Sequence, residues 1–302
     1  MKAIVLKGYG GVDQLEQRDI AEPKPGPGEL RVRVAAASVN PIDWKLRSGD
    51  AKAMMPLEFP AVLGRDVAGE VVEVGPGVTA LKPGDKVLGL VQRGYAEQVV
   101  AKADAFARVP PGLDLRDAAA LPLVLLTGAQ LIEEAARLKR GDTVLVTGAL
   151  GGVGRTAVYV AKQLGARVIA GVRAKQKAEA AGLGADQVVA IDDDAEIAKL
   201  PQLDAIADTV GHETIAKLLP RLKLGGTLGS VLGEPPAAKA KSITVRAFMA
   251  HPDASRLGEL AAAVARGELK IPIVKRLPLA QAAEAQRFAE RGGSGGKVLL
   301  TM

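Results

Sequence analysis

Short apolar runs separated by prolines and glycines characterise the first third of the chain. Runs of this length that are rich in valine, such as residues 66–74, are typical of β-strands. Prolines and glycines gather between them, as in Pro83-Gly84-Asp85, where they end strands and set turns. We expect strands at 3–6, 29–37, 66–74, 86–90 and 96–100. Residues 1 to about 110 are therefore predicted to form a compact β-rich domain.

From residue 115 the pattern changes, and strands begin to alternate with helices. A helical stretch runs to residue 138. Strands are then expected at 143–146, 166–172, 187–191, 203–209 and 226–231, and helices at 155–164, 175–181, 213–219 and 254–266. A strand, a helix and a final strand follow at 273–277, 280–291 and 297–301. This alternation predicts βαβ units and a doubly wound parallel sheet, so the fold class is α/β.

The length and composition indicate a soluble two-domain protein. The chain has 302 residues, of which 48% are hydrophobic and 25% charged, as in ordinary globular proteins. The absence of cysteine excludes disulfides, thiolate metal sites and cysteine nucleophiles. The apolar start is too short for a signal peptide, and Pro122 and Gly128 interrupt the apolar stretch 118–132. We expect a cytoplasmic location.

A net charge of +6 and a pI near 9.4 leave two interpretations open, a polyanionic partner or a basic surface without a specific role. Aromatic residues make up only 3% of the chain, which leaves little material for stacking nucleic-acid bases. We therefore do not expect a nucleic-acid partner or a membrane partner.

The segment "VTGALGGVG", residues 146–154, places four glycines in nine residues directly after a predicted strand and before a predicted helix. Residues 149–154 fit the dinucleotide-binding fingerprint with alanine in the first place. Glycines there permit the tight turn, let the backbone approach a pyrophosphate, and aim the helix dipole at that anion. A glycine turn without a ligand is the alternative, but the strand-turn-helix context favours a phosphate cradle.

The end of the next strand indicates which dinucleotide binds. NAD-binding proteins place an acidic residue about twenty positions after the glycines, where it binds the ribose 2′-hydroxyl. Here the chain reads Arg173-Ala174-Lys175-Gln176-Lys177 and has no carboxylate before Glu179. Cations at a helix start oppose the helix dipole, so their presence favours a 2′-phosphate. NADPH is the expected cofactor.

Several ordered segments carry a resemblance to a known family. They are "SVNPIDWKLRSG" (38–49), "LGRDVAGEVVEVGPGV" (63–78), "KPGDKVLGL" (82–90), "GYAEQVV" (94–100), "AAALPLVLLTGAQ" (118–130) and "GGSGGKVLL" (292–300). With the glycine loop, they make almost the whole chain similar to the medium-chain dehydrogenase/reductase superfamily, and within it to the zinc-free quinone oxidoreductase (zeta-crystallin-like) branch.

That resemblance implies a GroES-like β-rich catalytic domain, residues 1–120 and 267–302, with a Rossmann NADP-binding domain, residues 121–266, inserted into it. The nicotinamide would lie in the cleft between them. The cofactor-binding residues that the resemblance implies are Asn40, Thr127, Gly151, Gly152, Val153, Arg173, Lys177, Gly211, Leu232 and Lys297. A homodimer is expected.

Two motifs that suggest other chemistry are set aside. Gly211-His212-Glu213 looks like the zinc-ligand tripeptide of zinc alcohol dehydrogenases, but in those enzymes it stands where this chain has Gly64-Arg65-Asp66. His251 is the only other histidine, so a three-ligand catalytic site cannot be assembled in the usual way. No metal is expected, and His212 is predicted to lie in a loop near the cofactor. Tyr159, three residues before Lys162, is interpreted as a packing residue rather than a catalytic tyrosine.

The reaction that remains possible without a metal is hydride transfer to an acceptor whose product anion is already stabilised by delocalisation. Reducing a quinone or an α,β-unsaturated carbonyl leaves a delocalised anion, which a few donors can stabilise. The candidate catalytic residues are Asn40, Lys45 and Arg65, with Arg47 as a further donor. Lys45 replaces a tyrosine and Arg65 a small or apolar residue of many relatives, and both could instead be solvated surface cations. Asp43 and Asp66 are interpreted as structural partners of these cations.

We therefore expect an NADPH-dependent, zinc-independent reductase of quinones or enones. The alternatives left open are an enoyl-thioester reductase and a non-catalytic NADPH- or RNA-binding relative.

Overall fold

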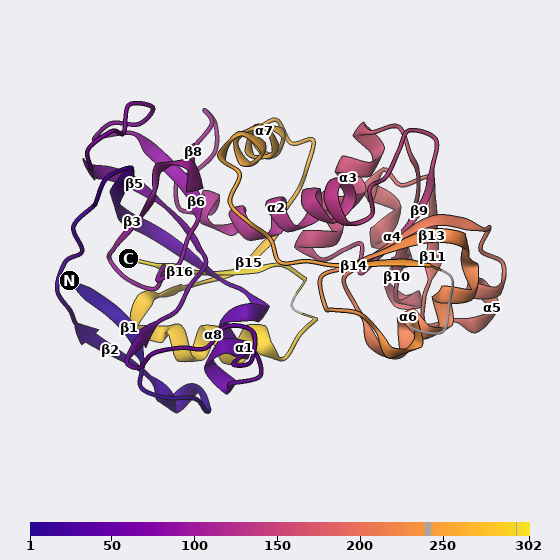
Figure 1. The fold of residues 1–302 in the computed structure, drawn as a ribbon, viewed down its shortest axis with the longest axis horizontal. Helices are drawn as coiled ribbons and strands as arrows, with labels where there is room; N and C mark the ends of the chain where they lie inside the picture. Colours follow the sequence, from indigo (N-terminus) through magenta and orange to yellow (C-terminus); the bar gives the residue numbers. More distant parts are fainter. Residues whose placement is uncertain (239–242, 294) are drawn as a thin grey trace. The chain divides into compact units, whose positions relative to one another are not determined.

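A computed structural model describes residues 1–238, 243–293 and 295–302 and separates the chain into two units. Unit 1 consists of Met1–Leu123 and His251–Met302, and unit 2 of Val124–Ala250. Each unit has its own hydrophobic core and its own sheets. The ribbon in Figure 1 follows both units in sequence colours.

Unit 2 contains a six-stranded, entirely parallel sheet. Its strands, in spatial order, are β11 (Gln187–Ala190), β10 (Arg167–Val172), β9 (Thr143–Thr147), β12 (Leu203–Asp208), β13 (Leu222–Ser230) and β14 (Thr244–Ala247). Numbered by sequence, this order is 3-2-1-4-5-6, the order of the dinucleotide-binding Rossmann fold. The strand order reverses between β9 and β12, which makes the carboxyl ends of these two strands the switch point where ligands bind.

In the described residues, four α-helices belong to the crossover connections of this sheet. They are α3 (Gly152–Gln163), α4 (Lys177–Ala180), α5 (Asp194–Ala198) and α6 (His212–Leu218). The longest, α3, buries the small and branched residues Ala157, Val158, Val160 and Ala161, a stripe with the spacing that lets one helix face pack on a sheet. The buried core of the unit includes Leu145, Ile169 and Ile206 from three neighbouring strands.

Unit 1 is built on a seven-stranded mixed sheet and a smaller three-stranded one. The large sheet has the order β15 (Ile273–Pro278), β16 (Lys297–Thr301), β3 (Glu29–Val39), β5 (Asp66–Val74), β6 (Lys86–Leu90) and β8 (Phe106–Arg108), with β7 (Gln98–Lys102) also paired to β3. The small sheet has the order β2 (Leu15–Asp19), β1 (Lys2–Leu6) and β4 (Ala61–Val62). The helices are α1 (Pro41–Ser48), α7 (Ala254–Ala265) and α8 (Ala282–Glu290).

The C-terminal strand completes the N-terminal domain. β16 lies antiparallel to β3, with Val298 opposite Val39 and Thr301 opposite Ala36. In Figure 1 this yellow strand lies among the indigo and purple strands of the first hundred or so residues. The arrangement confirms the GroES-like plus Rossmann architecture expected from the sequence.

One predicted boundary needs correction. The sequence placed the helix at 254–266 with the nucleotide-binding domain, whereas α7 belongs to unit 1. It packs on β8, where a Cβ added to Gly258 would lie 3.6 Å from the Cβ of Ala107. The alternation of strands and helices ends at β14, so α7 has no further strand of unit 2 to cover.

Helix α2 (Pro122–Gln130) continues into a π-helical turn at Leu131–Ala135 and contains the boundary between the units. Within the described residues, Asp117–Ala135 is long and apolar enough to cross a membrane by length and composition alone. However, 78% of its most apolar window is buried inside the protein, as in a core helix.

The turn between β9 and α3 generates the first prediction. Gly154 is buried, and a Cβ added to it would lie 2.2 Å from the carbonyl oxygen of Gly148 and 2.7 Å from Cα of Ala149. Gly154→Ala should therefore lower the free energy of unfolding by about 1–3 kcal/mol, the cost of overpacking a tight site. Urea denaturation followed by far-UV circular dichroism measures this loss.

Gly151→Ala is the matched control for that experiment. Gly151 is exposed at φ −72°, and its nearest contact to an added Cβ is at 3.3 Å. This variant should unfold close to the wild type. Equal stabilities of the Gly154 and Gly151 variants would contradict the close packing described here.

Candidate functional site

The carboxyl edge of the unit 2 sheet is organised by the buried carboxylate of Asp208. It accepts hydrogen bonds from Thr147 Oγ1 at 2.9 Å, Ser230 Oγ at 3.0 Å and the backbone N–H groups of Val210 and Gly211 at 3.0 and 2.9 Å. Thr147, Asp208 and Ser230 lie at the ends of β9, β12 and β13. One side chain thus joins three strand ends at the switch point and sets the conformation of the loop that follows β12.

The glycine loop lies beside this network. Gly148 has φ +61°, a conformation that L side chains rarely adopt. Gly151 precedes α3 in an extended conformation and is exposed. The N–H groups of Gly152, Val153 and Gly154 come first in the helix and have no acceptor one turn earlier in it. Gly151 is exposed and Gly152 and Val153 are half-buried, so the loop presents positively polarised N–H groups where the fingerprint predicts a phosphate.

Apolar side chains flank the same edge. Gly211, the first residue before α6, has φ +70°, and a Cβ added to it would lie 2.8 Å from Cδ1 of Leu232. Val210 and Leu232 are 36% and 42% exposed, although large apolar side chains are usually buried. Thr127, on α2, is buried within the unit. The predicted cofactor residues Gly211 and Leu232 therefore lie next to each other, with Gly211 buried and Leu232 exposed.

The two residues predicted to bind the 2′-phosphate, Arg173 and Lys177, differ in exposure and in ion pairing. Arg173 follows β10 and is exposed. Lys177 donates from Nζ to Glu196 Oε1 at 2.6 Å, and Glu196 Oε2 also accepts from the N–H of Ala190. These two contacts lower the pKa of Glu196, with the Ala190 N–H as the larger cause, so its carboxylate stays charged. Arg173 is the more accessible of the two cations.

In unit 1, the buried carboxylate of Asp66 holds together the other group of predicted site residues. Its Oδ2 accepts from Ser38 Oγ at 2.6 Å and Asn40 Nδ2 at 2.8 Å, and lies 3.3 Å from Lys297 Nζ. Its Oδ1 accepts from the N–H of Leu123 at 2.7 Å, near the start of α2. The interpretation of Asp66 as a partner of Lys45, Arg47 or Arg65 was therefore wrong, because the cation that it contacts is Lys297.

The same cluster brings Asn40 and Lys297 into direct contact. Lys297 Nζ donates to Asn40 Oδ1 at 2.5 Å and to the carbonyl oxygen of Val39 at 3.4 Å. Asn40 Nδ2 is engaged by Asp66. Both ends of the Asn40 carboxamide are therefore held within the protein, and Asn40 and Lys297 are only 1% and 8% exposed.

Asp43 and Tyr95 form a second buried pair beside Asn40. Tyr95 donates its hydroxyl proton to Asp43 Oδ2 at 2.7 Å, and the same oxygen accepts the N–H of Asn40 at 2.8 Å. Burial raises the pKa of Asp43 to about 6, against the lowering effect of these two hydrogen bonds. Burial and the neighbouring Asp43 charge also raise the pKa of Tyr95. Asp43 is therefore held by neutral donors rather than by one of the predicted cations.

The three other cations predicted as candidate donors, Lys45, Arg47 and Arg65, each have different surroundings. Arg47 is buried, donating to Gln286 Oε1 at 2.8 Å and to both carboxylate oxygens of Glu290 at 3.2 and 3.0 Å, which makes it a link between α1 and α8 rather than a free donor. Arg65 is half-buried, and its Nε donates to the carbonyl oxygen of Val91. Lys45 is half-buried, and the described residues give its ammonium group no hydrogen bond or ion pair.

The sequence predicted no metal site and placed His212 in a loop, and both predictions concern residues that the structure describes. Among those residues, no three histidine, aspartate or glutamate side chains gather as a metal site would require. His212 is the first residue of α6, directly after the switch-point loop. The sequence predicted a loop position, whereas its backbone begins the helix.

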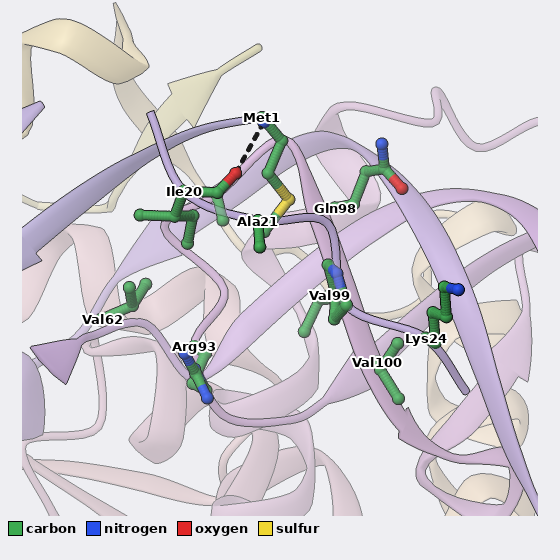
Figure 2. Close-up of a pocket in the computed structure, with 11 residues that line it drawn as sticks. Met1, Ile20, Ala21, Lys24, Val62, Arg93, Gln98, Val99 and Val100 are labelled. Carbon is green, nitrogen blue, oxygen red and sulfur yellow. Dashed lines mark hydrogen bonds between the residues drawn. The ribbon is translucent and has the colours of Figure 1, made fainter. Parts of the chain in front are cut away.

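A separate cavity of about 270 Å³ lies in unit 1, away from these predicted residues (Figure 2). It is lined by Met1, Ile20, Ala21, Pro23, Lys24, Val62, Arg93, Ala96, Gln98, Val99 and Val100. None of the residues predicted to bind cofactor or substrate belongs to this lining, so the cavity and the candidate site are different features.

Comparison with known proteins identifies the family. A model described as "alcohol dehydrogenase GroES-like domain" matches residues 26–111, and one described as "zinc-binding dehydrogenase" matches residues 183–300. A chloroplast envelope quinone oxidoreductase homolog of Arabidopsis thaliana is 32% identical over 99% of this chain and 98% of its own. The chain belongs to the medium-chain dehydrogenase/reductase superfamily.

Other members of the superfamily resemble the chain over its full length. The acryloyl-coenzyme A reductase of Metallosphaera sedula is 30% identical over 100% of both chains. The structure of a quinone oxidoreductase from Coxiella burnetii has a TM-score of 0.90 and 32% identity, covering 100% of this chain and 99% of that one. A mycobacterial protein solved in complex with NADPH has a TM-score of 0.83 and 32% identity, with both chains fully covered. The first two are named as a reductase and an oxidoreductase, and this chain is an enzyme of the same oxidoreductase family.

Two residues that organise the site were not predicted for that role. Asp208 ends a strand in the sequence Ala207-Asp208-Thr209, where a polar residue after an apolar run could have indicated a switch-point contact. Asp66 was interpreted as a partner for a nearby cation, but the cation is Lys297, 231 positions further along the chain. No local pattern could have revealed that pairing.

The raised pKa of Asp43 predicts an unusual pH dependence of stability. A carboxyl group whose pKa is higher in the folded protein than in the unfolded chain binds its proton more tightly when folded. The free energy of unfolding should therefore fall as the pH rises from about 4 to about 6. For this one group the loss is about 3 kcal/mol, and it should level off above the folded-state pKa.

Asp43→Asn, which cannot ionise, should lack this contribution. Urea unfolding of both proteins at pH 4, 5, 6 and 7 measures it as the change in their stability difference. Trp44 is the only tryptophan and is packed against the unit 1 core, so its fluorescence reports on that unit. A stability difference that is constant with pH would show that Asp43 titrates normally.

Proposed function

We propose that the protein reduces quinones or α,β-unsaturated carbonyl compounds with NADPH, by hydride transfer and without a metal. The observation that carries this proposal is the glycine cradle at the switch point of a 3-2-1-4-5-6 sheet, with Arg173 at the end of the neighbouring strand. The cradle fits a pyrophosphate, because Gly151 is exposed and the first N–H groups of α3 follow it.

In this proposal the chain's residues bind and orient the cofactor, which supplies the hydride when bound. Gly151, Gly152 and Val153 hold the pyrophosphate through backbone N–H groups. Arg173 and Lys177 bind the 2′-phosphate. Thr127, Gly211 and Leu232 line the cofactor, and Asn40 and Lys297 complete its site. The exposed apolar rim of Val210 and Leu232 supports a role in contacting a flat ring.

The second task is to stabilise the negative charge that develops on the acceptor oxygen. A cation aimed at that oxygen lowers the energy of the transition state more than that of the ground state. Asn40 is held at both ends of its carboxamide by Lys297 and Asp66, so Lys45 and Arg65 are the stronger candidates for this charge stabilisation. Water can supply the final proton.

Metal independence is part of the proposal. One matching family model is described by its zinc binding, but the chain has no cysteine and only two histidines, and catalytic zinc sites usually need three such ligands. Quinone and enone reduction need no metal to hold an alkoxide. Turnover should therefore persist after treatment with a chelator.

A second candidate function is reduction of an enoyl thioester. A full-length relative is an acryloyl-coenzyme A reductase, and a basic chain with a net charge of +6 suits an anionic coenzyme A ester. A panel of quinones, enones and enoyl thioesters, each run with NADPH and with NADH, separates these activities. Binding of NADPH without turnover of any acceptor would favour a non-catalytic relative.

We expect the active protein to be a cytoplasmic homodimer.

Cofactor preference can be tested at Arg173. A charge-assisted hydrogen bond to the 2′-phosphate contributes about 1.5–3 kcal/mol, so NADPH should bind at least roughly tenfold more tightly than NADH. Arg173→Ala should reduce the ratio of the NADPH affinity to the NADH affinity. Arg167→Ala is the control, because Arg167 is exposed at the opposite end of the same strand. Equal affinities of the wild type for the two cofactors in a fluorescence titration would refute the preference.

Acceptor stabilisation can be tested at Lys45 and Arg65. Replacing either by methionine keeps aliphatic bulk and removes the charge. For the side chain that faces the acceptor, kcat/KM for 1,4-quinones should fall by roughly ten- to a thousandfold, as when one oxyanion donor is lost. NADPH affinity should hardly change. Lys52→Met removes the same charge from an exposed turn and should have no effect.

If both substitutions leave quinone reduction intact, Lys45 and Arg65 are surface cations. Stabilisation of the acceptor must then come from backbone N–H groups, Asn40 or water.

A further inference from the structure

The segments that follow β10 and β11 include the acidic residues Glu179, Asp192 and Glu196, and two of these three are paired with cations. Lys177 is paired with Glu196, and Arg155 Nη2 with Glu179 Oε1 at 2.7 Å. Asp192 differs from both glutamates, because its Oδ1 accepts only a backbone N–H, that of Ala174, at 2.8 Å. In the described residues no cation forms an ion pair with Asp192.

The position of Asp192 matters because of what the same strand ends bind. β10 and β11 are parallel neighbours, with Val172 opposite Ala190. Asp192 follows β11 by two residues, as Ala174 follows β10. The end of the second strand of such a sheet is where the adenosine ribose lies. The carboxylate is therefore bonded to the backbone one residue after Arg173, the exposed cation of this edge.

We propose that Asp192 is a specificity-determining residue of the nucleotide site, where its negative charge opposes the 2′-phosphate and limits the preference for NADPH over NADH. This inference rests on the proposed cofactor function. Asp192 occupies an N–H group that a phosphate oxygen could otherwise use, and it lowers the positive potential that Arg173 and Lys175 create. A ribose with a free 2′-hydroxyl carries no charge there and avoids the repulsion.

Charge and hydrogen bonding at this position can be separated by one substitution. Asp192→Asn keeps an oxygen that accepts from the Ala174 N–H and removes only the negative charge. The turn at Ala174–Gln176 should therefore keep its conformation. Asp194→Asn is the matched control: it makes the same charge change two residues away, on an exposed carboxylate paired with Lys217 at 2.8 Å.

The test compares binding of 2′,5′-ADP and 5′-AMP, which differ only in the 2′-phosphate, by isothermal titration calorimetry on the full-length protein. Asp192→Asn should tighten 2′,5′-ADP three- to tenfold and change 5′-AMP less than twofold. Asp194→Asn should change both by less than twofold. The gain in the Asp192 variant should shrink at 0.5 M salt, because an exposed charge is screened.

The possible results distinguish the two proposals. If the wild type prefers 2′,5′-ADP but Asp192→Asn leaves the ratio of the two affinities unchanged, the role of Asp192 is overturned and the cofactor proposal stands. An equal gain for both fragments also overturns it, since that result would reflect a general change in the site. If the wild type binds neither fragment, nor NADPH, the cofactor proposal fails and the role of Asp192 fails with it.

Discussion

The structure of unit 1 depends on one buried carboxylate. Asp66 is fully buried, and its two oxygens receive Ser38, Asn40, Lys297 and the N–H of Leu123. Those groups belong to or adjoin β3, β16 and α2, so one charge fixes three elements. An ionised carboxylate away from water needs partners of this kind, and removing one charged partner typically costs about 3–5 kcal/mol. These contacts tie β16 and the start of α2 to β3 and β5.

Asp208 is the corresponding buried carboxylate of unit 2, and its hydrogen-bond donors are neutral groups. Its bonded partners among the described residues are two hydroxyl groups and two backbone N–H groups, with no cation. Hydroxyl and N–H donors satisfy a carboxylate without placing a positive charge next to the glycine loop. In both units, a buried aspartate at one end of a strand is satisfied by donors from the neighbouring elements.

Regular, locally encoded features were predictable from the sequence, and long-range ones were not. The strand 66–74 has the same bounds as β5, and the glycine loop lies between a strand and a helix as expected. Helix α1 was not predicted, although Pro41 begins it and Gly49 at φ +91° ends it, because eight residues with a buried Asp43 and Arg47 show little amphipathic pattern. The pairings of Lys177 with Glu196 and of Arg47 with Glu290 decide which cations are available. Such pairings depend on tertiary packing, which spacing along the chain does not encode.

The pairing of β16 with β3 has a consequence for how the chain folds during synthesis. β3 and its partner are separated by the whole of unit 2, so unit 1 stays incomplete until residues 297–301 have left the ribosome. Unit 2 is contiguous, is made earlier, and contains all strands of its own sheet; domains of this kind generally fold as units as they emerge. Until then the edge of β3 that receives β16 is unpaired, and Asp66 lacks Lys297. Unpaired edges of this kind promote aggregation, so a nascent chain stalled before residue 297 should depend on chaperones, whereas unit 2 within it should already be native.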